Sequence, residues 1–94
     1  MLFAEKIKQL REERQLPQRQ LAAELQIDTA TYCKIERGDR RAKREQVVKL
    51  AEWFHTDTKE LLTLWLADKV IEAMKDEREL ANEALGIVQK HIEK

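Results

Sequence analysis

Apolar residues recur every three or four positions along most of this chain, with charged residues between them. The first such run contains Phe3, Ile7 and Leu10, and its spacing predicts an amphipathic helix over about residues 2–14. Only two glycines and one proline occur, whereas Leu, Ala, Glu, Lys, Arg and Gln are abundant. Since β-hairpins depend on turn-forming residues, the pattern favours an all-α protein without a sheet.

Two short helices are predicted next. Pro17 interrupts the first helical pattern and can open a second helix, which we expect to end near Leu25. Asp28 or Thr29 then caps a third helix by accepting hydrogen bonds from backbone N–H groups. The third helix should end at Gly38, because glycine readily adopts the left-handed conformation common at helix C-termini.

The second half of the chain continues the helical pattern. Apolar residues between Val47 and Phe54 predict a fourth helix. Asp57 and Glu60 have the spacing of a capping box and predict the start of a fifth helix, which should end near Lys75.

The tail of the chain allows two interpretations. Asp76 and Glu79 resemble another capping pair, which would start a separate last helix. Alternatively, one long helix runs over residues 58–93. Either arrangement places a short apolar seam on one side of the tail, formed by Ala81, Leu85, Val88 and Ile92.

Composition narrows the possible functions. The 94 residues are 38% charged and 43% hydrophobic, which is typical of one globular domain. Cys33 is the only cysteine, and His55 and His91 are far apart, so we expect no disulfide, no metal site and no cofactor. His55 is expected to cap the end of the fourth helix.

Two further features concern location. The apolar runs are far shorter than the roughly 20 residues of a membrane-spanning helix, so no membrane partner is expected. Charged residues follow Met1 too early for a secretory signal. We therefore expect a cytoplasmic protein.

The net charge of zero conceals an asymmetry between the two halves. Residues 1–49 carry 12 Lys or Arg and 8 Asp or Glu, whereas residues 50–94 carry 6 and 10. Between Lys34 and Arg44, six basic residues stand against two acidic ones. Such a basic segment is typical of a phosphate-binding surface.

The order of residue types around the second and third predicted helices is more specific than their helical spacing. The chain reads LPQRQLA over residues 16–22, then Leu25 and Ile27, then IERG over residues 35–38. This pattern closely resembles the Cro/repressor-like family of helix-turn-helix proteins, also called the xenobiotic-response-element (XRE) family.

The resemblance extends from about Phe3 to Leu62. It implies an all-α, five-helix, lambda-repressor-like helix-turn-helix domain over residues 1–66, followed by a C-terminal helical extension over residues 67–94. In size and plan the chain is similar to phage repressors and to the controller proteins of restriction–modification systems.

The resemblance also implies roles for particular residues. Double-stranded DNA would be read by the outer edge of the third helix. The implied base-reading residues are Thr29, Ala30, Thr31, Cys33 and Lys34. The implied phosphate-binding residues are Gln18, Arg37, Arg40, Arg41 and Lys43. Glu36 lies near the core edge and needs a partner, and the resemblance supplies Arg11 as a structural ion pair.

Three departures from the family pattern matter. Gln26 stands at the turn where the family usually has glycine, and a left-handed backbone there would cost about 1 kcal/mol. Lys43 replaces the small polar residue that usually caps the fourth helix. Thr29 and Ala30 are short where relatives often have long amides, so specificity would depend more on DNA shape.

Surplus apolar residues predict a homodimer. The segment from Leu61 to Leu66 has more large apolar side chains than one small domain can bury. We expect the interface to contain Leu61, Leu64, Trp65, Leu85, Val88 and Ile92. The alternative is that the last helix folds back over this surface within one chain.

These observations predict a homodimeric transcriptional regulator that binds a palindromic operator. A second hypothesis is an antitoxin-like interaction module whose acidic C-terminal helices bind a partner protein. An enzyme is the least favoured class, because no catalytic triad, paired catalytic carboxylate site or phosphate-binding glycine loop is recognisable.

Overall fold

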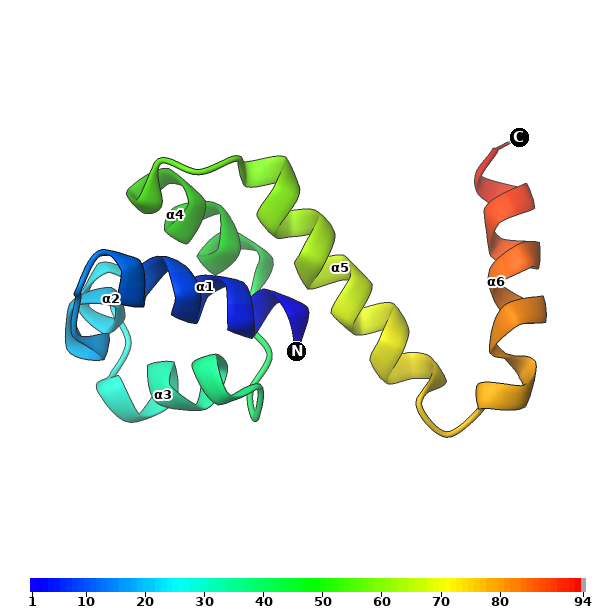
Figure 1. Ribbon diagram of the computed structural model, residues 1–94, viewed down its shortest axis with the longest axis horizontal. Coiled ribbons are helices and arrows are strands. Elements are labelled where there is room, and N and C mark those ends of the chain that lie inside the picture. Colours follow the sequence, from blue (N-terminus) through cyan, green and yellow to red (C-terminus); the bar gives the residue numbers. More distant parts are fainter. Residues whose placement is uncertain (94) are drawn as a thin grey trace.

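The computed structural model describes residues 1–93, which form six α-helices and no β-strand (Figure 1). The helices are α1 (Leu2–Glu13), α2 (Gln18–Glu24), α3 (Thr29–Arg37), α4 (Arg44–Phe54), α5 (Thr58–Met74) and α6 (Arg78–Ile92). The prediction of an all-helical chain is confirmed. Residue 94, the end of the expected extension, lies outside the described residues.

One apolar core lies between α1, α2, α3, α4 and the first turns of α5 (Figure 1). α2 packs against α3, α4 packs against α5, and α1 contacts both α3 and α5. The most deeply buried side chains come from all five helices: Ile7, Leu21, Tyr32, Ile35, Val47, Leu50, Phe54 and Leu61. The periodicity that predicted these helices therefore also marks their buried sides.

The first four helices end in the same way. Each is followed by one residue in the left-handed backbone conformation, and these residues are Gln15, Gln26, Gly38 and His55. Paired hydrogen bonds such as Asp39 N to Lys34 O and Gly38 N to Ile35 O define a Schellman motif at each end. The expected ends at Gly38 and His55 are confirmed, and Gln26 does have a positive φ of 57°.

Two helix starts also follow the sequence signals. Asp28 caps α3 by accepting a 2.6 Å hydrogen bond from Thr31 N. Asp57 caps α5 by accepting one from Lys59 N. Glu60 makes no reciprocal bond to the backbone of Asp57 among the described residues, so the expected capping box is only half formed.

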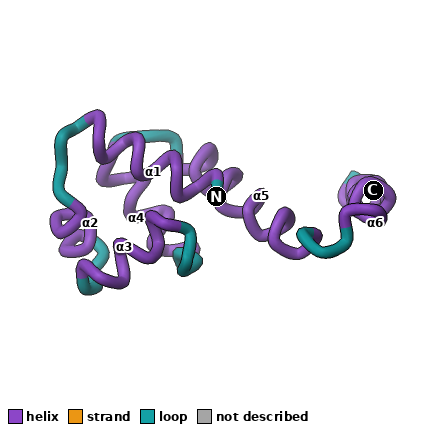
Figure 2. Tube along the Cα trace, turned by 60° about the horizontal axis from the view of Figure 1, so that its bottom comes forward, coloured by secondary structure: helices purple, strands orange, loops and turns teal. Residues whose placement is uncertain are grey.

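The tail forms a separate helix, which confirms one of the two interpretations. α5 continues past the core to Met74, the chain turns at residues 75–77, and α6 then stands apart from the bundle (Figures 1 and 2). The single helix over residues 58–93 is wrong. Residues 75–79 are all charged and exposed, so this stretch has no apolar side that packing could hold in a continuous helix.

The expected capping pair at the start of α6 is also wrong. Glu77, not Asp76, precedes the helix, and its side chain makes no capping hydrogen bond. No residue of α6 is buried, so this helix does not fold back over its own chain. The expected boundary between residues 66 and 67 falls inside α5. None of the helices described in residues 1–93 combines the length and apolar character needed to cross a bilayer.

Candidate nucleic-acid interface

α2 and α3 form a tight pair of short helices joined by the turn at Gln26. Ala22 is buried where the two helices approach each other, and Leu21, Tyr32 and Ile35 pack around it. Ile27 packs against the core just after the turn. The small side chain of Ala22 therefore permits the close approach that a helix-turn-helix requires.

α3 has one buried side and one accessible side. Tyr32, Ile35 and Glu36 face inward and are buried. The outer side carries the residues expected to read bases: Thr29, Ala30 and Lys34 are exposed, and Thr31 and Cys33 are half-buried. Figure 1 shows α3 along the lower edge of the bundle, apart from α6. The structure thus leaves three of the five expected base-reading residues exposed on α3 and the other two half-buried.

Glu36 is the centre of a polar cluster behind α3. Arg11 Nη2 lies 2.7 Å from Glu36 Oε1, and Arg11 Nε donates to Glu36 Oε2 at 3.0 Å. Arg11 also donates from Nη1 to the carbonyl of Leu16. The side chains of both ionic partners are largely buried, at 14% and 3% exposed. This pair connects α1 to α3 and to the segment that leads into α2.

The protonation of the cluster follows from its contacts. Burial of the Glu36 carboxyl favours its neutral form, but hydrogen bonds, chiefly from Arg11, outweigh burial and lower its pKa below 4.5. The hydrogen bond to Glu36 in turn raises the pKa of Arg11. Burial raises the pKa of Tyr32, whose hydroxyl has no hydrogen-bond partner within residues 1–93. The cluster is therefore a fixed ion pair at neutral pH.

Gln18 belongs to this cluster in the structure. Its Nε2 donates to Glu36 Oε1 at 3.2 Å, although the sequence suggested a contact with a DNA phosphate. Gln18 is half-buried at the first turn of α2. The observed bond holds the start of α2 against the buried side of α3.

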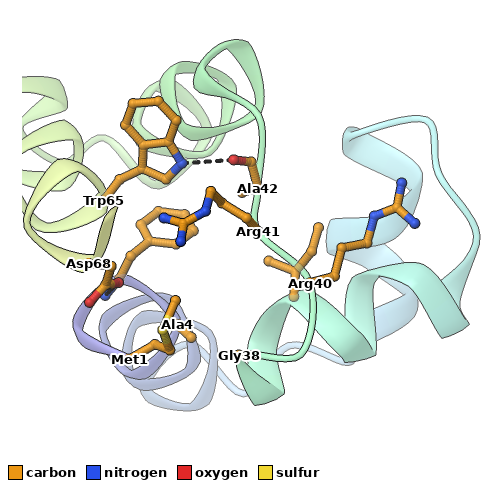
Figure 3. A pocket seen from close by; sticks show the side chains of 10 residues that line it. Met1, Ala4, Gly38, Arg40, Arg41, Ala42, Trp65 and Asp68 are labelled. Carbon is orange, nitrogen blue, oxygen red and sulfur yellow. Dashed lines mark hydrogen bonds between the residues drawn. The ribbon is translucent and has the colours of Figure 1, made fainter. Parts of the chain in front are cut away.

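The expected phosphate-binding residues point in different directions. Arg37 and Asp39 are exposed and form an ion pair with Nε and Oδ2 3.1 Å apart. Figure 3 shows that Arg40 points toward the α2–α3 side of the segment, whereas Arg41 points toward α1 and α5. Lys43 is exposed. A phosphate contact from Arg41 would therefore require its side chain to leave this position.

Helix α4 compensates for its unusual first residue. Lys43 precedes the helix and lacks the short polar side chain of a usual cap, but its backbone N–H donates to Gln46 Oε1 at 2.8 Å. This bond is the half of a capping box that runs back from the third helical position.

The residues expected at a dimer interface fall into two groups. Leu61 has 0% of its surface exposed and belongs to the core of its own chain, which corrects its expected place in an interface. Leu64 and Trp65 are half-buried against that core. Leu85, Val88 and Ile92, on α6, are exposed.

Sequence reasoning missed two connections that hold the bundle together. Asp68 of α5 is buried and caps α1, because its carboxylate oxygens accept from Leu2 N and Phe3 N at 2.9 Å each. Arg14 donates to the carbonyl of Phe54 and stacks over its ring. No local pattern could have shown either contact, since each joins residues at least 40 positions apart.

The fold and the accessible side of α3 define a DNA-binding protein of the helix-turn-helix class. Residues 2–64 match the family model described as a helix-turn-helix domain. The chain therefore belongs to this helix-turn-helix family, of the Cro/XRE type. Comparisons with curated proteins and with solved structures found no match.

Proposed function

We propose that this protein is a sequence-specific transcriptional regulator that binds a palindromic operator as a homodimer. The observation that carries the proposal is the accessible side of α3, which is held by a buried ion pair and bordered by a basic segment. In a helix-turn-helix the second helix enters the major groove, and α3 occupies that position.

The chemistry of α3 suggests how bases would be read. Lys34 is exposed and can donate to guanine O6 or N7. The methyl groups of Thr29 and Ala30 suit contact with thymine. Thr31 and Cys33 flank these residues at the edge of the contact. Few direct hydrogen bonds are available from such short side chains, so DNA shape would contribute to the choice of sequence.

The basic segment supplies the part of the affinity that does not depend on sequence. Arg40 and Lys43 are exposed and are free to approach the phosphates beside the groove. Arg37 is exposed as well, but its ion pair with Asp39 would have to open first. Gln18 would likewise have to exchange its bond to Glu36 for a phosphate.

The α5–α6 tail supports the dimer. α6 buries no residue in its own chain, yet Leu85, Val88 and Ile92 are exposed on it together with Ile87, which is 71% exposed. A second copy would cover this apolar surface. Two-fold helix-turn-helix dimers read half-sites about 34–36 Å apart.

DNA selection followed by titration tests the proposal. The sequences that the protein selects from random duplexes should contain inverted repeats. Lys34→Ala should lower the preference for the selected site over random DNA by about tenfold, because a base contact contributes about 1–3 kcal/mol of discrimination. An equal loss on both DNAs would contradict a reading role for Lys34.

A second function is favoured by the same exposed helix. The antitoxin-like hypothesis needs a surface for a different protein, and the apolar side of α6 beside acidic Glu79 and Glu83 provides one. Sedimentation of the full chain separates the two: a dimer at tens of micromolar supports the regulator, whereas a monomer supports a heterologous partner.

A further inference from the structure

The segment between α3 and α4 is anchored by α5, which lies far from it in sequence. Arg40 N bonds back to Lys34 O, and Lys43 N bonds forward to Gln46. Residues 41 and 42 lie between these two bonds, and Ala42 O accepts a hydrogen bond from Trp65 Nε1 at 2.7 Å. Since Ala42 is buried, this bond fixes the middle of the basic segment against the fold.

The next turn of α5 adds a second anchoring contact. We call the two contacts together the joint. Asp68 lies three residues after Trp65 and caps the first turn of α1 with both carboxylate oxygens. Met1 leads into that turn and packs against Gly38, where an added Cβ would lie 2.8 Å from Met1 Cγ. α5 therefore contacts the basic segment after α3 through Trp65, and the start of α1 through Asp68.

Arg41 lies inside this joint. Figure 3 shows its side chain extending between Trp65 and α1, while Ala42 accepts the bond from Trp65. Its Nη1 is buried and has no hydrogen-bond partner among residues 1–93. The cavity shared by Trp65, Asp68, Gly38 and Arg41 has a volume of about 10 Å³, too small for a ligand larger than water. The site is therefore a joint between segments and not a binding pocket.

We propose that Trp65 and Asp68 are positioning residues for DNA binding. By fixing the basic segment and the start of α1 against α5, they determine where Arg40 and Lys43 stand relative to the reading surface of α3. Neither residue touches DNA in this arrangement, because both lie on α5 behind the segment. The proposal rests on the DNA-binding function proposed above and adds a second determinant of phosphate contact.

The two tryptophans of the chain provide a matched test. Trp65→Phe keeps a ring in place and removes the N–H that bonds Ala42. Trp53→Phe makes the same change at a half-buried ring that makes no such bond to the segment. Affinity for duplex DNA is measured over a range of salt concentrations, at temperatures well below the unfolding midpoint of each variant.

Trp65→Phe should weaken binding about fivefold, the effect of losing one ordinary hydrogen bond. The slope of log affinity against log salt should also fall by about one, because a displaced cation no longer meets a phosphate. The ratio between operator and random DNA should not change, since phosphate contacts carry no sequence information. Trp53→Phe should leave affinity and slope unchanged.

A second measurement does not depend on the stability of Trp65→Phe. In the Trp53→Phe chain, the single indole N–H signal belongs to Trp65. Its hydrogen exchange should be slow in the free protein and slower still with DNA bound, if the joint holds during binding. Rapid exchange in the DNA complex would overturn the proposal.

The outcomes also separate this inference from the proposed function. If the unmodified chain does not bind duplex DNA, the proposed function fails. If it binds DNA, and Trp65→Phe lowers only the unfolding temperature while affinity and salt slope match those of Trp53→Phe, then Trp65 is merely structural and only the inference fails.

Discussion

Helix α3 and the terminal helix α6 are both accessible, but they expose opposite kinds of surface. α3 buries Tyr32, Ile35 and Glu36 and presents polar and basic groups to the outside. α6 buries nothing and presents Leu85, Ile87 and other large apolar residues. A polar surface on a rigid support suits nucleic acid, whereas an unsupported apolar surface suits protein. The two accessible helices therefore differ in the kind of partner that their surfaces suit.

The largest expected effect comes from removing the support of α3. Arg11→Ala leaves the Glu36 carboxylate buried without its main partner, so the free energy of unfolding should fall by about 3 kcal/mol at pH 7. Lys8→Ala, on the exposed side of α1, should change it by less than about 0.5 kcal/mol. Denaturant titrations of both variants measure the difference.

The same pair makes a signed prediction about pH. Because the pKa of Glu36 is lowered in the folded protein, its contribution to stability is present above 4.5 and is lost as the pH falls through the lower folded-state value. The difference between the unmodified chain and Arg11→Ala should therefore shrink from pH 7 to pH 3. A difference that stayed constant would mean that the pair is not what supports α3.

The next largest effect is expected on the apolar surface of α6. Leu85→Asp places a charge on the apolar side of α6 and should weaken the dimer about tenfold or more, because burying a leucine contributes about 1.5–3 kcal/mol. Thermal stability of the monomer should not change, since Leu85 contacts no core residue. Asn82→Asp adds the same charge off the apolar seam and serves as the control. Sedimentation equilibrium measures both, and equal behaviour of the two variants would argue against a dimer through α6.

A smaller effect is expected at the turn that orients α3. Gln26→Gly relieves the left-handed strain of a side chain and should raise the free energy of unfolding by about 1 kcal/mol. Gln20→Gly makes the same change inside α2 and should lower it by roughly 0.5–1 kcal/mol. Denaturant titrations measure both changes in the free energy of unfolding. Opposite signs would show that the backbone conformation at the substituted position, not the glycine itself, decides the result.

The smallest effect distinguishes two neighbouring arginines. Arg40 is exposed and Arg41 points toward α5 (Figure 3), so only Arg40→Ala should reduce the salt slope of DNA binding, by about one. Arg41→Ala should leave the slope unchanged. Anisotropy titrations over a range of salt concentrations provide the measurement, and a reduced slope for Arg41→Ala would show that this side chain turns outward in the complex.

Local pattern was sufficient for much of the fold. The helical periodicity, Pro17, the cap at Asp28 and the glycine at Gly38 predicted five helix positions within a few residues. These signals act over one or two turns of backbone, so they can be read from neighbouring residues. The capping pair expected at Asp76 failed because charged residues alone do not determine where a helix begins.

Other features depended on contacts between distant segments. The packing of α5 against α1 and the α3–α4 segment decides three features. These are whether the tail leaves the core, which way the Arg41 side chain points, and which side chain caps α1. The amino-acid order alone thus determined a chain of amphipathic helices, since helix formation and amphipathicity are local properties. Only the folded arrangement placed Trp65 and Asp68 behind the basic segment, because burial and hydrogen bonding between remote residues arise from the whole fold.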